Sequence, residues 1–206
     1  MQLSGDVLNS ALQKFTCVYV FGDQYGQVAE PADIDHPPAY IDAQRTFQFP
    51  LPTKLVAHTQ VSSVASPSDA LYALAGLAGS YSRFRLDARF PAIQKIQLFR
   101  TWLDASFSGD MGDHVFAFYA ADIPIGLITI KKHPAHTQVG LLAVAPDHQN
   151  KGIATALIQH ARYISAQEFH LPLHVTTQAI NTGAIACYTK NGGLDLHQKY
   201  VAHYWK

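Results

Sequence analysis

The chain has 206 residues, of which 48% are hydrophobic and 15% charged, a composition typical of a folded globular protein and not of a disordered one. Its 15 basic and 15 acidic residues give a formal net charge of zero, which argues against nucleic acid or a membrane surface as a partner. The sequence has neither a basic N-terminal region followed by an apolar run nor a stretch of membrane-spanning length. We therefore expect no signal peptide and a cytoplasmic protein.

Cysteine and histidine usage gives no sign of a disulfide framework or a metal site. Cys17 and Cys187 are isolated in the sequence, and the 11 histidines form no His-Glu-x-x-His or comparable ligand set. We expect a reduced protein without a bound metal.

The first 60 residues predict a small α/β portion that is too short for a full core of its own. Residues 15–21 are β-branched and aromatic and predict a buried strand, and residues 39–52 alternate as a strand does. Prolines make residues 29–39 irregular, and residues 62–69 have the composition of a polar linker that ends in a helix cap. We therefore divide the chain into an N-terminal portion, residues 1–60, and a larger domain, residues 61–206.

The larger domain predicts a regular succession of helices and strands. We expect helices at 69–79 and 93–107, a hairpin of strands 115–120 and 125–131, a strand at 138–144, a helix at 153–167, a strand at 173–177, a helix at 182–190, and strands at 194–198 and 200–205.

The turn between the strand at 138–144 and the next helix predicts an anion site. It reads Gln149-Asn150-Lys151-Gly152-Ile153-Ala154 and leaves backbone N–H groups unpaired at a helix N-terminus, where the helix dipole favours negative charge. A small residue at Gly152 and at Ala154 lets a bulky anion approach the main chain. An ordinary strand–turn–helix without a ligand fits these residues equally well.

Two common phosphate motifs do not fit this turn. The P-loop needs Lys-Ser or Lys-Thr after its last glycine, but Ile153 follows Gly152. The dinucleotide fingerprint needs three glycines at fixed spacing, and only one is present.

The turn does match the pattern Gln/Arg-x-x-Gly-x-Gly/Ala, through Gln149, Gly152 and Ala154. Asn181 follows downstream, with Tyr188 seven residues later and then Gly192. In this order and separation, the two motifs resemble the acetyl-CoA-binding region of the GNAT acetyltransferase superfamily.

The resemblance implies a fold, a cofactor and a set of contacts. The fold is an α/β GNAT fold, with a mixed, mostly antiparallel central sheet flanked by helices, after a degenerate N-terminal α/β portion. The cofactor is acetyl-CoA, which leaves as CoA, and no metal is implied. The residues that match the cofactor-binding positions are Leu142, Ala143, Val144, Gln149, Asn150, Lys151, Gly152, Ile153, Ala154, Thr155 and Asn181.

The acceptor side is expected in residues 81–91, which connect the first two helices of the larger domain. Arg83, Phe84, Arg85 and Asp87 suit a partner that carries phosphates and a flat base, because arginine clamps phosphate and aromatic rings stack. A solvated loop whose arginines pair with Asp87 or nearby acids is the alternative.

The Ser-Arg-Phe-Arg stretch, its following Phe-Pro and the closing His203-Tyr204-Trp205 are similar to a GNAT subgroup that acetylates nucleotide-linked amino sugars such as dTDP-fucosamine (dTDP-4-amino-4,6-dideoxygalactose). The subgroup implies a role in surface polysaccharide synthesis. Gly193 and Ala154 depart from its pattern, and neither departure removes a reactive group.

Two residues are candidates for catalysis. Tyr188 can protonate the departing thiolate, since its reference pKa of about 10 is near that of a thiol, about 8.5. The backbone of residues 142–144 can donate to the thioester carbonyl oxygen. A tyrosine that only packs in the core is the alternative for Tyr188.

Asp42 matches a position where the subgroup carries a carboxylate, so it can act as the base for the acceptor ammonium. Pairing of Asp42 with Arg45 or Lys54 fits as well, and deprotonation of the amine in bulk water would make a base unnecessary. Asn150 and Lys151 are expected to assist the pyrophosphate mainly through their main chain. Asn181 is expected to bond either the pantetheine or the start of its helix.

Two other functions fit the sequence. The first is a GNAT enzyme for another small amine, such as an antibiotic or polyamine, although residues 83–89 are rich in arginine where such cationic acceptors need acids. The second is a non-catalytic acyl-CoA sensor. The aromatic C-terminal strand fits a homodimer interface and a core strand equally well.

Overall fold

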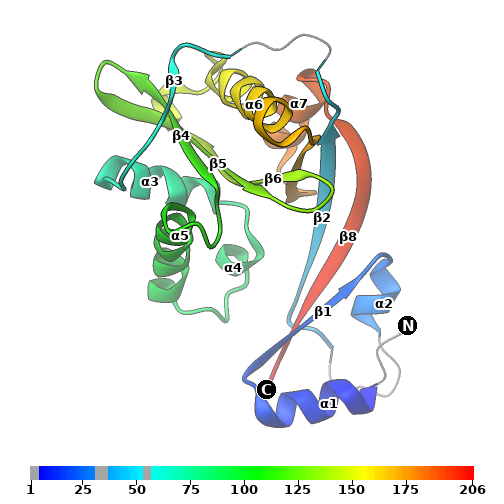
Figure 1. The fold of residues 1–206 in the computed structure, drawn as a ribbon. Coiled ribbons are helices and arrows are strands. Elements are labelled where there is room, and N and C mark those ends of the chain that lie inside the picture. The colour runs from blue at the N-terminus through cyan, green and yellow to red at the C-terminus, as the bar shows by residue number, and fades with distance from the viewer. Residues whose placement is uncertain (1–4, 31–36, 53–56) are drawn as a thin grey trace.

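The computed structural model describes residues 5–30, 37–52 and 57–206. Within these residues one mixed sheet of eight strands runs through the molecule in the order β1-β8-β2-β7-β6-β5-β4-β3, mostly antiparallel (Figure 1). The strands are β1 (Cys17–Gly22), β2 (Tyr40–Phe49), β3 (Val61–Ser63), β4 (His114–Ala120), β5 (Ile123–Lys132), β6 (Thr137–Val144), β7 (Leu173–Gln178) and β8 (Leu194–Trp205).

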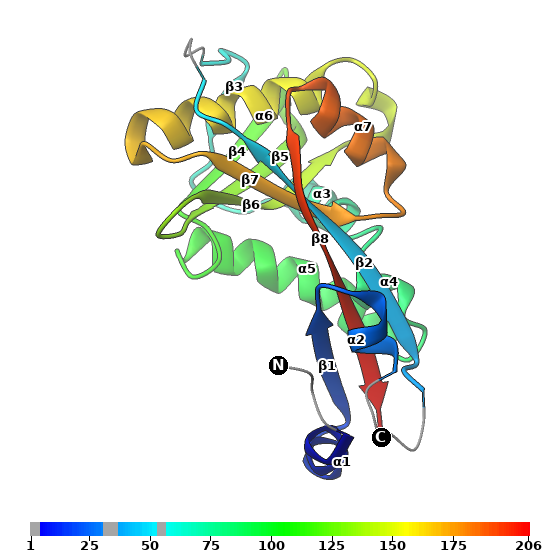
Figure 2. The ribbon, with the colours of Figure 1, turned by 90° about the vertical axis from the view of Figure 1, so that its right-hand side faces the viewer.

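Helices cover both faces of the sheet, which gives the α/β class expected from the sequence. They are α1 (Gly5–Lys14), α2 (Tyr25–Ala29), α3 (Asp69–Ala78), α4 (Arg83–Leu86), α5 (Ala92–Phe107), α6 (Ile153–Ile164) and α7 (Thr182–Lys190), with a 3-10 turn at Pro146–His148 and a π turn at Ser165–Phe169. Helices α6 and α7 lie on one face, α3 and α5 lie on the other, and α4 lies beside β2 (Figure 2).

Each face has its own core. Phe47, Phe49 and Leu157 belong to the cluster under α6 and α7, whereas Leu71 and Leu103 belong to the cluster under α3 and α5. A third, smaller cluster joins α1, β1 and α2 to the far end of β8 (Figure 1). Tyr204 is fully buried in this third cluster, where its hydroxyl donates to the carbonyl of Val28. The C-terminal aromatic strand is therefore a core strand.

The structure corrects three expectations about secondary structure. Residues 61–63 form β3, which pairs with β4 through Val61 and Phe118, so the expected linker begins later. Residues 194–205 form one strand and not two, because the backbone pairing with β2 continues through Lys199, opposite Gln44. Helix α6 ends at Ile164, and the π turn takes the place of the last turn expected.

Strand β2 lies between β7 and β8 and is antiparallel to both, with Gln44 opposite Gln178 and Tyr40 opposite His203. The sheet therefore runs across the division that we expect at residue 60. That division stays a prediction, and strand β2 from the N-terminal portion is an interior strand of the sheet.

Strands β6 and β7 are parallel but pair only at their beginnings, over residues 137–139 and 173–175. Beyond Val139 the two strands have no pairing in the described residues, so the backbone of residues 140–144 is not bonded to β7. A register shift in the β5–β6 pairing leaves Thr129 opposite this point, and its hydroxyl accepts a hydrogen bond from the Leu141 amide at 2.9 Å. Gly140 fits here because a Cβ would lie 2.8 Å from the same hydroxyl oxygen.

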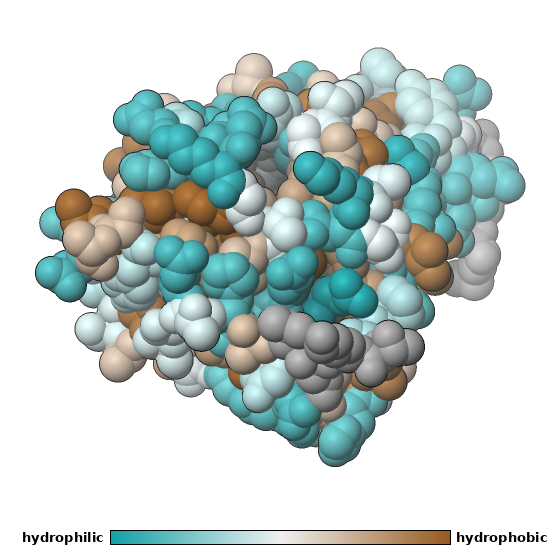
Figure 3. Space-filling view, turned by 90° about the horizontal axis from the view of Figure 1, so that it is seen from above, coloured by the Kyte–Doolittle hydropathy of each residue, from teal (hydrophilic) through white to brown (hydrophobic). Residues whose placement is uncertain are grey.

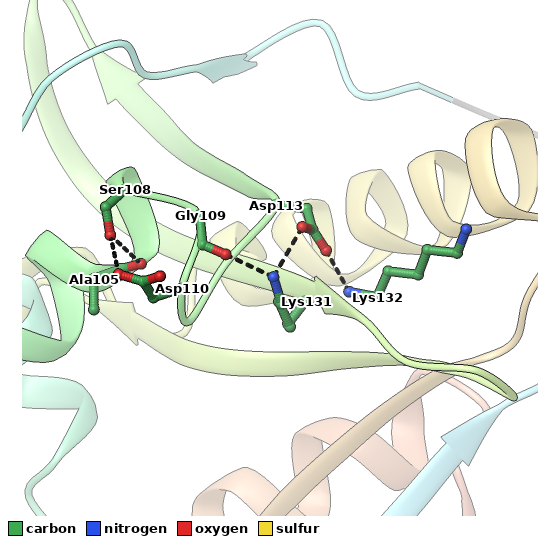
Figure 4. Close-up of polar contacts among 7 residues, drawn as sticks. All are labelled: Ala105, Ser108, Gly109, Asp110, Asp113, Lys131 and Lys132. Carbon is green, nitrogen blue, oxygen red and sulfur yellow. Dashed lines mark hydrogen bonds and ion pairs between the residues drawn. The ribbon is translucent and has the colours of Figure 1, made fainter.

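The connection from α5 to β4 is fixed to the sheet by two lysines of β5. The Lys131 ammonium donates to the Gly109 carbonyl at 2.6 Å and to the Asp113 carboxylate at 3.1 Å, and the Lys132 amide donates to the other Asp113 oxygen at 2.6 Å (Figure 4). Hydrogen bonds from these groups lower the pKa of Asp113 despite its burial. These contacts hold the loop that follows α5 against strand β5.

Seen from above the view of Figure 1, the surface is mostly hydrophilic, with small hydrophobic patches (Figure 3). None of the helices in the described residues has the length and apolar character needed to cross a membrane.

Candidate active site

The turn before α6 has the backbone shape that the sequence predicts for an anion site. Asn150 and Gly152 have positive φ angles of 59° and 83°. The first amide that α6 pairs along its own helix belongs to Ala156, which donates to the Gly152 carbonyl, and no side chain caps the helix. The amides of residues 153–155 therefore have no partner within the helix, and a Cβ at Gly152 would meet nothing within 4 Å.

The polar side chains of this turn bond to the turn itself. The Gln149 amide group donates to the Val144 carbonyl at 3.1 Å, and the Lys151 ammonium donates to the Asp147 carbonyl at 2.8 Å. With these side chains bonded within the turn, its main chain is the part that an anion would meet, and the roles of Asn150 and Lys151 stay predictions. Leu142 and Val144 pack toward α6, while Ala143 is buried on the opposite face.

Asn181 begins α7. Its side-chain oxygen accepts from the Ala184 amide at 3.2 Å, and its nitrogen donates to the Thr177 hydroxyl at 3.1 Å. Of the two roles expected for Asn181, the structure shows the bond to the start of its helix.

Tyr188 lies in the core on the α7 face, 5% exposed, with its ring against the edges of Phe47 and Phe49 at centroid distances of 5.7 and 6.3 Å. Burial raises the pKa of the Tyr188 phenol well above its usual value, and the neighbouring Cys187 raises it further. The hydroxyl is therefore protonated at neutral pH and able to donate. The packing fits a core tyrosine and leaves the acid role as a prediction.

Asp42 lies on the opposite face of the sheet from Tyr188. Side chains alternate along β2, so Phe47 faces α7 while Asp42 and Thr46 face the side of α3, α4 and α5. The hydrogen bond between the hydroxyls of Thr46 and Thr176 at 2.9 Å shows that β2 and β7 share these faces. The two candidate catalytic residues thus approach the sheet from its two sides.

The Asp42 carboxyl is 3% exposed and accepts a hydrogen bond from Gln44 at 3.0 Å. Burial raises its pKa, and hydrogen bonds from Gln44 and Gln178 and the charge of Arg83 offset this only in part. A carboxylate with a raised pKa is a better proton acceptor than an exposed one. Arg45, one of its expected partners, pairs instead with Asp195. Lys54 lies outside the described residues.

Arg83 lies in α4 close to Asp42, and its guanidinium packs over Phe84 at 4.2 Å and over Tyr19 at 5.4 Å. Desolvation lowers the pKa of Arg83, and the charge of Asp42 raises it, which places the two groups within electrostatic range. Arg85 is exposed, and its carbonyl accepts from the Lys95 ammonium at 3.0 Å. The structure thus brings Arg83 and Phe84, but not the Arg85 side chain, to the buried carboxylate.

Asp87 is 3% exposed and bonds to two side chains of β8. One carboxylate oxygen accepts from His203 Nδ1 at 2.7 Å and from Trp205 Nε1 at 2.9 Å, and the other accepts from the Arg89 amide at 3.0 Å. Burial raises the pKa of Asp87, but these hydrogen bonds outweigh it, so the pKa lies below its usual value. Among the described residues no arginine side chain of the loop forms an ion pair with this carboxylate, which the solvated-loop alternative allowed.

Sequence reasoning missed His203 as a site residue. It is completely buried, and desolvation lowers its pKa, with Asp87 opposing and the charge of Arg83 assisting. No local motif marks it, because its partner Asp87 is 116 residues away in the chain. Among the described residues, no group of three histidines, cysteines or acids is arranged to hold a metal ion.

Comparison with known proteins identifies related chains. A family model described as "Acetyltransferase (GNAT) family" matches residues 81–193. Streptothricin acetyltransferase A of Bacillus subtilis (strain 168) is 30% identical over 90 residues, which cover 43% of this chain and 52% of that protein. The match thus spans about half the length of this curated relative.

Solved structures share the fold at low sequence identity. A functionally unknown conserved protein from Staphylococcus epidermidis has a TM-score of 0.62 at 14% identity, covering 98% of this chain and 78% of its own. A GNAT-family protein from Novosphingobium aromaticivorans, described as a putative acetyltransferase, has a TM-score of 0.61 at 14% identity, covering 95% and 77%. These matches extend over the N-terminal strands as well as the region that the family model covers.

Proposed function

The chain belongs to the acetyltransferase (GNAT) family, and we propose that it moves an acetyl group from acetyl-CoA to the amino group of a nucleotide-linked amino-deoxysugar. The proposed acceptor is of the dTDP-4-amino-4,6-dideoxygalactose kind, used in the cytoplasm for surface polysaccharide. The observation that carries this proposal is the arrangement of Arg83 and its aromatic neighbours next to the buried Asp42 carboxyl.

The donor half of the proposal rests on the main chain around α6. The unpaired amides of residues 153–155 and the open space at Gly152 suit a pyrophosphate at a helix N-terminus. The backbone of residues 142–144 pairs with β5 but not with β7, and the side that β7 leaves open suits the amide-bearing arm of CoA and its thioester. Bound acetyl-CoA would supply an activated acyl group, and these residues would hold and orient it.

The chemistry assigned to this chain consists of two proton movements. Asp42 takes a proton from the acceptor ammonium, directly or through water, so that the nitrogen lone pair is free to form the new N–C bond. As the C–S bond breaks, the Tyr188 hydroxyl gives its proton to the departing sulfur, and the second proton of the attacking nitrogen leaves to water, from which the Tyr188 phenolate is reprotonated. The placement of Asp42 and Tyr188 on opposite faces fits a donor and an acceptor that enter from different sides.

The acceptor half of the proposal rests on charge and ring chemistry. Arg83 can bind phosphate oxygens bidentately, and Phe84 with Tyr19 offers ring faces and edges for stacking. Asp87 supports this site without facing the acceptor, because its carboxylate is enclosed by hydrogen bonds from His203 and Trp205. The Arg85 side chain is exposed, so it could contact only the outer end of a long acceptor.

A cationic small amine is a second candidate acceptor, and two observations favour it. The curated relative from Bacillus subtilis is named as an acetyltransferase for streptothricin, and Asp42 would bind a cation as readily as it accepts a proton. Against this candidate stands Arg83, whose positive charge lies close to the same carboxyl.

A thiol-release assay with acetyl-CoA tests the proposal. We expect turnover with dTDP- or UDP-linked amino sugars and little with streptothricin or polyamines, and an Arg83→Gln variant should raise KM for the nucleotide sugars most. Arg100→Gln, which removes a guanidinium on α5 that packs over Tyr72, is the matched control. Turnover with cationic amines alone would contradict the proposed acceptor.

A further inference from the structure

A group of rings encloses His203 between α4, β1, β2 and β8. Tyr19, Tyr40, Phe84 and Phe90 contact the imidazole at centroid distances of 4.8, 5.4, 6.2 and 5.7 Å, and we call these four residues the aromatic box. Trp205 packs against Phe90 at 4.9 Å and closes the side next to Asp87. The box combines residues from four separate parts of the chain.

One nitrogen of His203 has no hydrogen-bond partner in the part of the chain that the structure describes. Its Nδ1 faces the Asp87 carboxylate at 2.7 Å and therefore carries the proton, which leaves Nε2 of the neutral ring as a hydrogen-bond acceptor. Nε2 is buried and without a hydrogen-bond partner among the described residues. A buried acceptor left unpaired is destabilising, so a ligand that supplies an N–H would be favoured here.

Arg83 supplies a matching donor. Its Nε–H is also buried and unpartnered among the described residues, and its guanidinium packs on Tyr19 and Phe84, two rings of the same box. The charge of Arg83 acts on His203, so the two groups lie close together. No carboxylate in the described residues lies within ion-pair distance of Arg83.

The distance from the box to the sheet centre suits an extended ligand. Tyr40 pairs with His203 and Gln44 pairs with Gln178 at the end of β7, and the β2 backbone between them spans about 13 Å. Asp42 lies between these two points. A ligand with a flat group in the box could therefore place another group near Asp42 or beyond it.

We propose that the aromatic box binds the base of the nucleotide, with the base N–H donating to His203 Nε2 and a neighbouring carbonyl accepting from Arg83 Nε. This inference rests on the proposed function and adds to it the recognition of a planar amide or imide edge. Asp87 is a positioning residue, because it holds the His203 tautomer that leaves Nε2 as an acceptor. Phe84, half-buried in the one-turn helix α4, is the wall that must move for a base to enter.

Calorimetric titration with dTDP and with its 3-methyl derivative, which lacks the base N–H, tests the site. We expect methylation to weaken binding about tenfold in the wild-type protein, as the loss of one buried hydrogen bond predicts. His203→Asn keeps a side-chain nitrogen near the position of Nδ1 for Asp87 and removes Nε2. In this variant dTDP should bind about tenfold more weakly, and methylation should have no further effect.

His197→Asn is the matched control, since it makes the same change at an exposed position of the same strand. Thermal unfolding of both variants checks that each is folded. If nucleotide sugars are acetylated but wild-type protein binds both dTDP forms equally, the base site is wrong and the proposed function stands. If no nucleotide binds and only cationic amines are acetylated, the proposed acceptor is wrong and the base site falls with it.

Discussion

The two faces of the sheet are built in different ways. On the face of α6 and α7, the candidate donor site consists mainly of backbone amides from one stretch of chain, residues 140–155, together with the helix that begins at Asn181. On the face of α4, the candidate acceptor site consists of side chains from β1, β2, α4 and β8. A site made of backbone depends on local conformation, whereas a site made of side chains depends on packing between distant segments.

This difference explains why the candidate donor site is easier to recognise in the sequence than the full set of residues on the acceptor side. Gly152 and the helix start after it follow each other in the chain, so the pattern of residues specifies the geometry. Asp87 and His203 meet only because β8 reaches α4 across the sheet. The first three predictions below test these faces and the fourth tests a histidine stack outside both sites, from the largest expected effect to the smallest.

Tyr188→Phe should have the largest effect. We expect kcat to fall about 100-fold, because the variant lacks the proton donor for the leaving thiolate, while acetyl-CoA affinity stays unchanged. Steady-state thiol release and calorimetry measure the two quantities, and Tyr163→Phe on α6 is the control. Unchanged kcat would contradict the acid role and leave Tyr188 as a core residue.

Asp42→Asn tests the acceptor face. We expect kcat/KM at pH 7 to fall on the order of tenfold to a hundredfold, with a smaller loss at high pH, where more of the amine is already neutral. Asp195→Asn, which removes the exposed partner of Arg45, should have little effect. An equal loss at every pH would indicate that Asp42 binds the amine and is not its base.

Gly152→Ala tests the donor face through its backbone. The φ of 83° strains any residue with a Cβ by about 1 kcal/mol. If the turn relaxes in the free variant and acetyl-CoA must restore this φ, binding should weaken about fivefold even though the added methyl meets no atom. Gly76→Ala in α3, also free of contacts, should raise stability by about 0.5–1 kcal/mol without changing affinity. Equal affinities for the two variants would contradict the main-chain cradle.

The smallest effect concerns the histidines beside the beginning of β6 and β7. His133, His136 and His174 stack at centroid distances of 5.1 and 4.1 Å, and burial with the nearby His136 and His197 lowers the pKa of His174 to about 4. Because the unfolded state binds this proton more readily, stability should be complete above pH 6.5 and fall as the pH drops toward 4. After allowance for screening by solvent, we expect the free energy of unfolding to fall by about 1 kcal/mol over this pH range.

His174→Gln should reduce this pH dependence. Urea unfolding at pH 7.5 and pH 5 measures it, and His170→Gln, outside the stack, is the control. A wild-type unfolding free energy that is the same at both pH values would show that the stack accepts protons without cost.

Much of the fold could be predicted because local signals agree with it. Helix α7 has the bounds expected, since Asn181 caps it and its apolar residues repeat at helical spacing. Strand β3 was missed because three residues, two of them exposed serines, carry no alternation. The sequence predicts two strands in place of β8, because residues 194–199 are exposed and polar enough to suggest a turn. Their pairing with β2 uses only the backbone, which leaves no signal in the sequence.

The candidate site was predictable to a similar degree. The positive φ at Gly152 and the capping role of Asn181 follow from residue type and position. The partners of Asp87 could not be predicted in this way. A carboxylate among arginines suggests an ion pair, but its partners are His203 and Trp205. Alternation along β2 predicts that Asp42 and Phe47 lie on opposite faces of the sheet. It does not predict which helices cover each face.

The insertion of β2 between β7 and β8 has a consequence for how the chain folds. Thr46 must find Thr176, 130 residues later, and Tyr204 must reach Val28 across 176 residues. Until β8 is synthesised, β1 lacks its strand partner and β2 lacks one of its two neighbouring strands. Such non-local pairing is slow, and β8, which follows the other seven strands of this sheet in the chain, is the one that completes it. Assembly of the acceptor face, which needs His203 from that strand, should therefore be among the last steps in folding.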